Sequence, residues 1–399
     1  MLSLEWTAIA AGAPDNPAYQ AAADPLALEG GAVLQEFPRS APNLPPPSTQ
    51  LDDGIRTWLA ARADPGSPVV VMVHGYQYDP SNHLGGGADD PYRLVYGVPG
   101  TMTAAGQPLD AHLSWLPLVG ECDDTGANPA DTAVAFAWLS EGSLGDFSNA
   151  CWDNDYKYAA LDLAPLASRA LANVLVALAA HGPTIRILAH SLGTRVVTQA
   201  IGLLRGGIAG LDRIVFMGGA EFCVDAAANF AGCAFDVINL ASRIDTVLSL
   251  GAEQGCHPVR PNGSPAAAVI GREGLGANSR WLDLQLDSDA LRTWFATGRA
   301  PNGVTYAIDA AAQNTAHPMA AMNHWAYYTN DGNRLLVRDL LLSPGLGVGQ
   351  FVASNVPAGV ARDGYGTFNG EPVPPTPQDC ATRRAMVVAS AATDGGTLA

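Results

Sequence analysis

Short apolar runs alternate with segments of helical spacing along the middle of the chain, and this alternation constrains the fold more than any other feature. Each run is nearly continuous in hydrophobicity, as a strand buried on both faces is. The runs are Val69–Val73, Ala133–Leu139, Ile185–Ala189, Arg213–Met217 and Val237–Ala241. Leu163–Ala180 and Leu192–Leu204 have the spacing and length of helices. Strands separated by helices imply right-handed βαβ units, so we predict an α/β fold with a mainly parallel central sheet flanked by helices.

Composition separates a central domain from two peripheral ends. Residues 1–50 are rich in Ala and Pro and predict an irregular N-terminal arm. Residues 346–399 lose periodicity and predict an irregular C-terminal extension. We expect residues 51–345 to form one domain that carries two long insertions, at about 77–132 and 251–280.

The formal net charge of the 399 residues is −17, which repels polyanions. We therefore expect neither nucleic acid nor an anionic membrane surface as the main partner. Residues 1–23 have no basic region and no apolar run of leader length, and the longest apolar stretch, Ala170–Ala180, is too short to span a bilayer. We expect no secretory signal peptide and no integral membrane segment, which leaves the cytoplasm and export by a non-Sec route both open. The sequence carries no signal of oligomeric state.

The cysteines show neither a C-x-x-C motif nor the paired Cys/His spacing of zinc sites, so we expect no structural metal. Several lie in polar sequence, as Cys122 and Cys151 do, where a thiol would be exposed. Disulfides and reduced thiols therefore remain alternatives.

The segment His190-Ser191-Leu192-Gly193 follows a predicted strand and opens a predicted helix. This is the context of the nucleophile elbow G-x-S-x-G, with Ala189 in place of the first glycine. A serine on that turn projects its hydroxyl above the sheet, so Ser191 is the candidate nucleophile. The Leu192 N–H then lies at a helix N-terminus, where it can stabilise developing negative charge. The alternative is that Ser191 is only an N-cap.

An earlier strand ends in His74-Gly75-Tyr76. Enzymes with a nucleophile elbow supply a second oxyanion donor from the loop after such a strand. Gly75 permits close approach of the backbone, and the Tyr76 N–H is the candidate donor. His74 is less favoured as the catalytic base, because a histidine at a strand end is more often a hydrogen-bonded scaffold residue. His190 is less favoured because it should point elsewhere on the elbow.

Asp245 lies a few residues past the Val237–Ala241 strand, where its carboxylate could accept the imidazole N–H and set the tautomer. A loop aspartate in solvent or a helix cap is the alternative. Asp225 is the reserve candidate, whereas Asp236 precedes the strand and would lie at the wrong edge of the sheet.

His324 precedes a predicted final helix from about Gly332 to Leu342, and a late loop there would bring it over the C-terminal edge of the sheet. It is the candidate base, and His317 and His257 are its competitors.

The first insertion carries aromatic residues that could line a cap over the site, although a plain surface loop would look the same in sequence. These residues are Tyr78, Tyr92, Tyr96 and Trp115.

Taken together, these segments resemble the α/β-hydrolase superfamily, and more narrowly a lipase- or esterase-like branch of largely uncharacterised bacterial proteins. The matching segments, in family order over about residues 51–345, are Val73-His74-Gly75-Tyr76, Ala135–Ser140, Tyr158–Asp162, Leu188–Val197, Ser242–Asp245 and His324–Tyr328. The resemblance implies Ser191 as nucleophile, Asp245 as acid, His324 as base, and the N–H groups of Tyr76 and Leu192 as the oxyanion hole. The two insertions depart from the branch.

We therefore predict a serine hydrolase that cleaves small neutral or lipid-like carboxylic esters through an acyl-enzyme, without a cofactor. An acyltransferase or a thioester or amide hydrolase could use the same triad. A catalytically silent binding module on the same scaffold is the alternative from another class.

Overall fold

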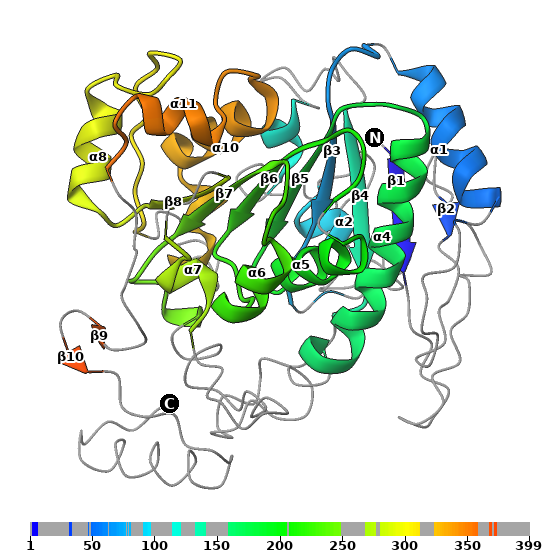
Figure 1. Ribbon diagram of the computed structural model, residues 1–399, viewed down its shortest axis with the longest axis horizontal. Helices are drawn as coiled ribbons and strands as arrows, with labels where there is room; N and C mark the ends of the chain where they lie inside the picture. The colour runs from blue at the N-terminus through cyan, green and yellow to red at the C-terminus, as the bar shows by residue number, and fades with distance from the viewer. Residues whose placement is uncertain are drawn as a thin grey trace, which may run out of the picture.

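A parallel β-sheet lies between two layers of helices in the computed structural model of the chain (Figure 1). The structure describes residues 2–6, 32–33, 47, 49–62, 64–76, 78, 80, 91–96, 114–120, 132–140, 159–205, 207–248, 268–276, 280–311, 323–357, 367–368 and 371–372. The predicted α/β architecture, with a parallel sheet flanked by helices, is confirmed.

The described sheet has eight strands in the order β2-β1-β4-β3-β5-β6-β7-β8, and neighbouring strands pair in parallel throughout. The strands are β1 (Leu2–Trp6), β2 (Ala32–Val33), β3 (Val69–Val73), β4 (Ala133–Trp138), β5 (Ile185–His190), β6 (Leu211–Met217), β7 (Asp236–Ala241) and β8 (Trp281–Gln285). β3 to β7 are the strands that hydrophobic continuity predicts. A separate antiparallel pair is formed by β9 (Thr367–Phe368) and β10 (Glu371–Pro372).

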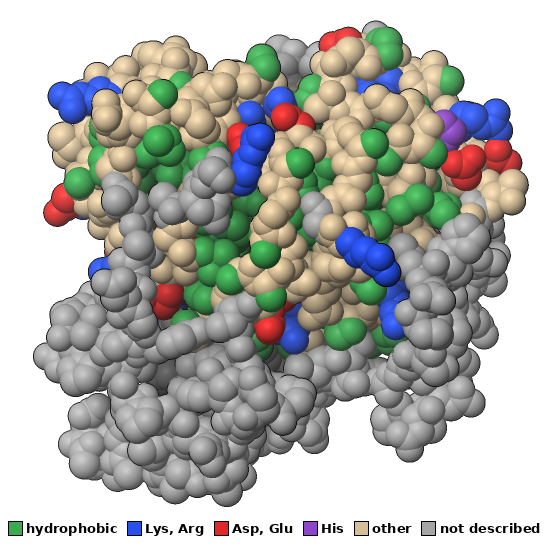
Figure 2. Space-filling view, viewed as in Figure 1, with side chains coloured by type: hydrophobic (Ala, Val, Ile, Leu, Met, Phe, Trp, Pro, Cys, Tyr) green, Lys and Arg blue, Asp and Glu red, His purple; other side chains and the backbone are tan. Residues whose placement is uncertain are grey.

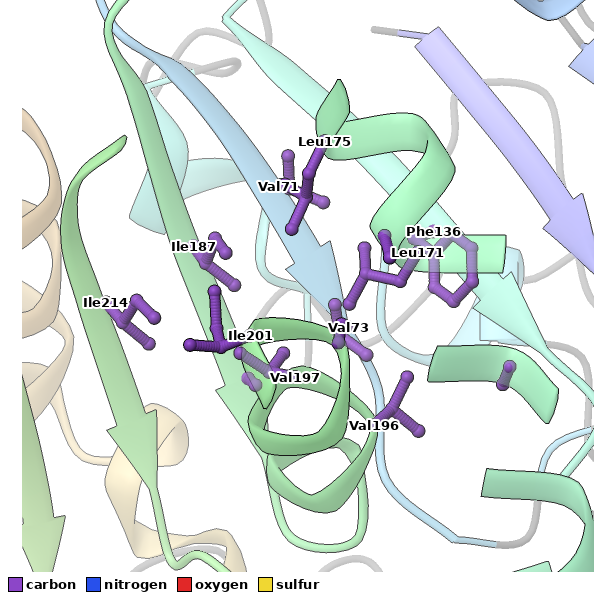
Figure 3. Packing of buried hydrophobic residues seen from close by; sticks show 14 of the residues in the cluster. Val71, Val73, Phe136, Leu171, Leu175, Ile187, Val196, Val197, Ile201 and Ile214 are labelled. Carbon is purple, nitrogen blue, oxygen red and sulfur yellow. The ribbon is translucent and has the colours of Figure 1, made fainter. Parts of the chain in front are cut away.

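The first helical layer packs on the side chains of one face of the sheet, as Figure 3 shows for α4 and α5. Within β3, Val69, Val71 and Val73 belong to this core, while Val70 and Met72 belong to the core on the other face, as the two-residue period of a strand requires. This layer comprises α1 (Thr49–Ala61), α4 (Ala164–Ala180), α5 (Gly193–Leu203), α6 (Cys223–Asn229) and α7 (Ile270–Glu273), and α4 continues from the π-helical turn η4 (Ala159–Leu163).

The second layer covers the opposite face with elements drawn from the later half of the chain and from the first insertion. These are α2 (Pro91–Leu94), η2 (Leu116–Val119), α8 (Asp289–Ala296), η7 (Asn323–Trp325), α9 (Ala326–Thr329), α10 (Asp331–Leu342) and α11 (Val348–Ala353). Two arginines from the sheet donate to backbone carbonyls where α10 ends: Arg186 to Leu341, at 2.5 Å, and Arg213 to Ser343, at 3.1 Å. Burial lowers the pKa of Arg213 to about 10, so the side chain remains a cation at this helix C-terminus, where positive charge is stabilising.

The expectation of an irregular N-terminal arm over residues 1–50 is corrected at two places. β1 pairs with β4 along its whole length, and Leu2 and Leu4 are fully buried. The alternation Leu-Ser-Leu-Glu supplies the buried face that a half-covered strand needs. In addition, α1 begins at Thr49, inside the expected arm.

The expected irregular extension from residue 346 is also corrected, because α11 places Val348 and Phe351 in the second core. The described part of the domain therefore continues past residue 345. Within the described residues, no helix combines the length and the apolar character that crossing a membrane requires.

Candidate active site

Ser191 lies on a tight turn between β5 and α5. Its φ of 52° places it in the left-handed region, which is uncommon for a residue with a side chain and is a form of stored strain. The turn is held by backbone hydrogen bonds: the Ser191 N–H donates to the Met217 carbonyl at 3.0 Å, and the Ser191 carbonyl accepts from the N–H groups of Thr194 and Ala220. The local geometry is that of the predicted elbow.

Two glycines allow the β3 loop to lie directly against this turn. A Cβ on Gly75 would lie 2.8 Å from Ser191 Cβ and 3.4 Å from its Oγ. A Cβ on Gly193 would lie 2.3 Å from the His74 carbonyl oxygen. The distances of 2.8 and 2.3 Å are shorter than a real Cβ atom tolerates, so glycine at both positions lets the two backbone segments pack directly against each other.

The two candidate oxyanion donors are the residues that follow Ser191 and Gly75 in the chain. Leu192 precedes the first turn of α5, so its N–H belongs to the amides that have no acceptor within the helix. Tyr76 is half-buried and follows Gly75 in the loop that touches Ser191. The structure therefore places Leu192 directly after the serine, and Tyr76 directly after the glycine that packs against the serine.

His324 and Asp245 form a buried pair, although they lie 79 residues apart in the chain. The His324 Nδ1–H donates to Asp245 Oδ2 at 2.7 Å, and the side chains are 3% and 0% exposed. Because the carboxylate accepts from Nδ1, the neutral ring keeps the lone pair on Nε2. That nitrogen is buried and has no hydrogen-bond partner among the described residues. It is thus available to accept a proton.

His190 connects the His324–Asp245 pair to the turn that carries Ser191. Its ring lies 4.6 Å from that of His324, centroid to centroid, and its Nε2–H donates to the His324 carbonyl at 3.0 Å. Burial, reinforced by the neighbouring His324, holds the pKa of His190 well below its usual range. Since His190 is the residue before Ser191, these contacts tie the His324 loop to the elbow.

A second tie joins the loop of His324 to the loop of Asp245. The Asn323 side chain donates to the Ile244 carbonyl and accepts from the Thr246 hydroxyl, at 3.3 Å. The residues on both sides of Asp245 are therefore bonded to the neighbour of His324. Sequence reasoning missed this brace, and no local pattern would have shown it, because the amide acts across the two loops.

Asp245 accepts further hydrogen bonds from the Leu248 N–H, at 3.0 Å on Oδ1, and from the Tyr327 hydroxyl, at 3.1 Å on Oδ2. Tyr327 was also missed. Its spacing of three residues from His324 on a helical segment would have placed both side chains on one face.

His74 is a scaffold residue, as expected. Its Nδ1–H donates to the Gly75 carbonyl at 2.9 Å, and its Nε2 accepts from the Trp138 N–H at 3.0 Å. Burial lowers its pKa to about 3. Both ring nitrogens are used inside the fold, so His74 has none left for proton transfer.

The two competing aspartates lie away from His324. Asp225 is on α6, where its backbone carbonyl accepts a hydrogen bond from the Asn229 side chain at 2.9 Å. Asp236 opens β7 at the opposite edge of the sheet, where it pairs with Arg280 at 3.0 Å. His257 and His317 lie outside the described residues.

Two of the aromatic residues suggested as a cap over the site are instead part of the core. Tyr96 and Trp115 are fully buried, and the Tyr96 hydroxyl donates to the Phe136 carbonyl at 2.6 Å. Tyr78 is half-buried and packs edge-on against His74. The side chain of Tyr92 is not among those that the structure describes.

Among the described residues, no group of His, Cys, Asp and Glu side chains could hold a metal ion. Cys223 and Cys233 are free thiols. The other four cysteines lie outside the described residues, so disulfides among them stay a prediction.

No protein-family model matches this chain, and no curated protein matches it. Among solved structures, the crystal structure of Aspergillus fumigatus lipase B is similar to it with a TM-score of 0.30 and 13% sequence identity, covering 85% of this chain and 74% of that one. Function is therefore inferred from the side chains and backbone of the site itself.

Proposed function

We propose that this protein is a serine hydrolase of the α/β-hydrolase type that cleaves carboxylic esters through an acyl-enzyme. One observation carries the proposal: a serine in left-handed conformation stands at the end of β5, and a buried His–Asp pair with a free Nε2 packs against the residue before it. An N-cap serine requires neither the strained turn nor the pair.

In the proposed reaction, Ser191 Oγ attacks the ester carbonyl carbon while its proton passes to His324 Nε2. Asp245 stabilises the imidazolium that forms. The tetrahedral intermediate collapses as the imidazolium protonates the leaving alkoxide, which departs as the alcohol. A water molecule, deprotonated by His324, then attacks the acyl-serine. The acid leaves, and the proton returns to Ser191.

The oxyanion of each intermediate would accept hydrogen bonds from the N–H groups of Tyr76 and Leu192. Both are backbone donors, one in the loop after β3 and one at the start of α5, so neither needs a side-chain rearrangement when the charge develops. The Leu192 amide also gains from the dipole of α5.

The charge of the protein supports a neutral substrate. The net charge of −17 disfavours anionic guests. On the face drawn in Figure 2, the coloured basic side chains are scattered and do not gather into a patch. A neutral ester or lipid-like ester therefore fits better than a phosphorylated one.

The test uses a fluorophosphonate probe, which phosphonylates an activated serine, together with p-nitrophenyl esters of graded chain length. Wild type should take the label, whereas Ser191→Ala should take none and His324→Ala should react at least ~10³-fold more slowly. A matched control is His181→Ala, because His181 also pairs with a carboxylate, that of Asp52 at 3.0 Å, on the α1 side of the fold. It should label like wild type.

An unlabelled wild type would refute the hydrolase. Label that survives in Ser191→Ala would show that the nucleophile is another residue. If labelling is as expected but an added alcohol acceptor takes the acyl group in preference to water, the protein is an acyltransferase on the same triad.

A further inference from the structure

Tyr327 shares with His324 a single oxygen atom of Asp245. The two residues are three apart on consecutive helical turns, and their donors converge on Oδ2, His324 Nδ1–H at 2.7 Å and Tyr327 O–H at 3.1 Å. Tyr327 is 1% exposed. We propose that Tyr327 is a positioning residue for the reaction, which aims the Asp245 carboxylate at His324. This inference rests on the proposed hydrolase function.

The carboxylate has donors on both oxygens. Leu248 N–H holds Oδ1 at 3.0 Å, while His324 and Tyr327 hold Oδ2. Donors on both ends prevent the carboxylate from rotating about its bond to Cβ. The imidazole of His324 donates one hydrogen bond to this buried carboxylate, and the Leu248 N–H and the Tyr327 hydroxyl, both uncharged, donate two more.

The fold keeps a place for the tyrosine ring. Gly218 follows β6 with a φ of 53°, and a Cβ there would lie 2.6 Å from Tyr327 Cε2 and 3.3 Å from Asp245 Oδ2. Any other residue at 218 would push on both the ring and the carboxylate. The absence of a side chain at 218 thus serves the contact between Tyr327 and Asp245.

The hydroxyl remains a donor at any working pH. Burial raises the pKa of Tyr327 well above its usual value, and the negative charge of Asp245 raises it further. Asp287 acts on the tyrosine in the same direction, and Arg272 opposes them. From the elbow, His190 faces His324 and is neutral.

This arrangement affects catalysis through the geometry of the Asp245–His324 pair. The hydrogen bond from Tyr327 helps to hold Oδ2 where it accepts from His324 Nδ1–H, so the imidazole ring keeps one orientation. Loss of the hydroxyl should let the carboxylate rotate and should slow the steps in which His324 takes or gives a proton.

The experiment compares Tyr327→Phe with Tyr306→Phe. Phenylalanine keeps the ring against Gly218, so the first variant retains its packing. The second is a matched control, because the Tyr306 hydroxyl also donates to a carboxylate, that of Asp339 at 2.6 Å, and Tyr306 is likewise 1% exposed. The kcat and KM of both variants are measured by steady-state hydrolysis of a p-nitrophenyl ester at one fixed pH.

Tyr327→Phe should lower kcat about tenfold with KM changed less than about twofold. Tyr306→Phe should leave kcat and KM within error of wild type. If the two variants behave alike, the inference is overturned.

A second readout does not depend on turnover. The Nδ1 proton of His324, identified by its loss in His324→Ala, should resonate far downfield in proton NMR and should move in Tyr327→Phe but stay fixed in Tyr306→Phe. An unmoved resonance overturns the inference. If wild type takes no fluorophosphonate label, the proposed function fails by itself, and the resonance then decides whether Tyr327 sets the state of the pair.

Discussion

The left-handed backbone of Ser191 makes a prediction about stability that needs no substrate. With φ at 52°, the residue occupies a conformation that costs an amino acid with a Cβ about 1–2 kcal/mol. Glycine avoids this cost but loses about 0.5–1 kcal/mol more conformational entropy than alanine on folding. Ser191→Gly should therefore be more stable than Ser191→Ala by up to about 1.5 kcal/mol.

Ser354 gives the matched control. It is the C-cap of α11 with φ −85° and ψ 7°, which alanine adopts without strain. Only the entropy term applies there, so Ser354→Gly should be less stable than Ser354→Ala by about 0.5–1 kcal/mol. The preference for glycine or alanine thus has opposite signs at the two serines.

The four variants are compared by urea denaturation, with the free energy of unfolding taken from linear extrapolation. Subtracting the Gly–Ala difference at 354 from that at 191 cancels the entropy term. What remains is the cost of the left-handed turn, expected at about 1–2 kcal/mol. A remainder indistinguishable from zero would mean that Ser191 is not strained, and the argument that the turn projects the hydroxyl would fall with it.

Two further predictions concern the scaffold. His74 has a folded pKa of about 3 against 6.5 unfolded, so the unfolded chain binds the extra proton, and stability is lost as pH falls from 6.5 towards 3. The free energy of unfolding falls by up to ~1.4 kcal/mol per pH unit in this range. Between pH 6.5 and 5, urea denaturation should therefore show a loss for His74→Gln that is about 2 kcal/mol smaller than the loss for wild type. An equal loss would contradict the assignment of a buried neutral ring. Arg213→Met removes a buried donor from the carbonyls that end α10 and should lower the free energy of unfolding by about 2–3 kcal/mol. Its control, Arg338→Met on the exposed side of α10, should change the free energy of unfolding by less than about 0.5 kcal/mol. Similar losses in the two variants would show that the carbonyl contacts contribute little.

The strands that hydrophobic continuity predicts are those buried on both faces by apolar side chains. Hydrophobic continuity does not predict β8, because its sequence, Trp-Leu-Asp-Leu-Gln, carries a buried carboxylate. Asp283 accepts hydrogen bonds from the side chains of Asn239 and Trp281 and from the N–H groups of Leu275 and Gly276. Burial raises its pKa despite these donors. The partners come from three segments of the chain, so no local window could show that an aspartate belongs inside.

The candidate site also contains residues that a local sequence pattern predicts and residues that it does not. Ser191 and Gly193 are predictable because the elbow is a local structure, in which strand, turn and helix follow one another within a dozen residues. Asp245 and His324 could be placed only by their position after strands and before a helix. The braces from Asn323 and His190 depend on how loops meet in space, so their residue types alone carry no signal.

The order of the strands explains why the site lies where it does. The chain passes from β3 to β4 on one side, then returns to β5 on the other, so connections leave β3 and β5 in opposite directions. In open parallel sheets, this reversal leaves a crevice outside the carboxyl ends of the two strands, where ligands bind. Pairing of Val73 with Ala189 brings the ends of β3 and β5 level, which sets Gly75 against Ser191. The same backbone pairing that builds the core therefore sets the loop of Gly75 and Tyr76 against the turn of Ser191.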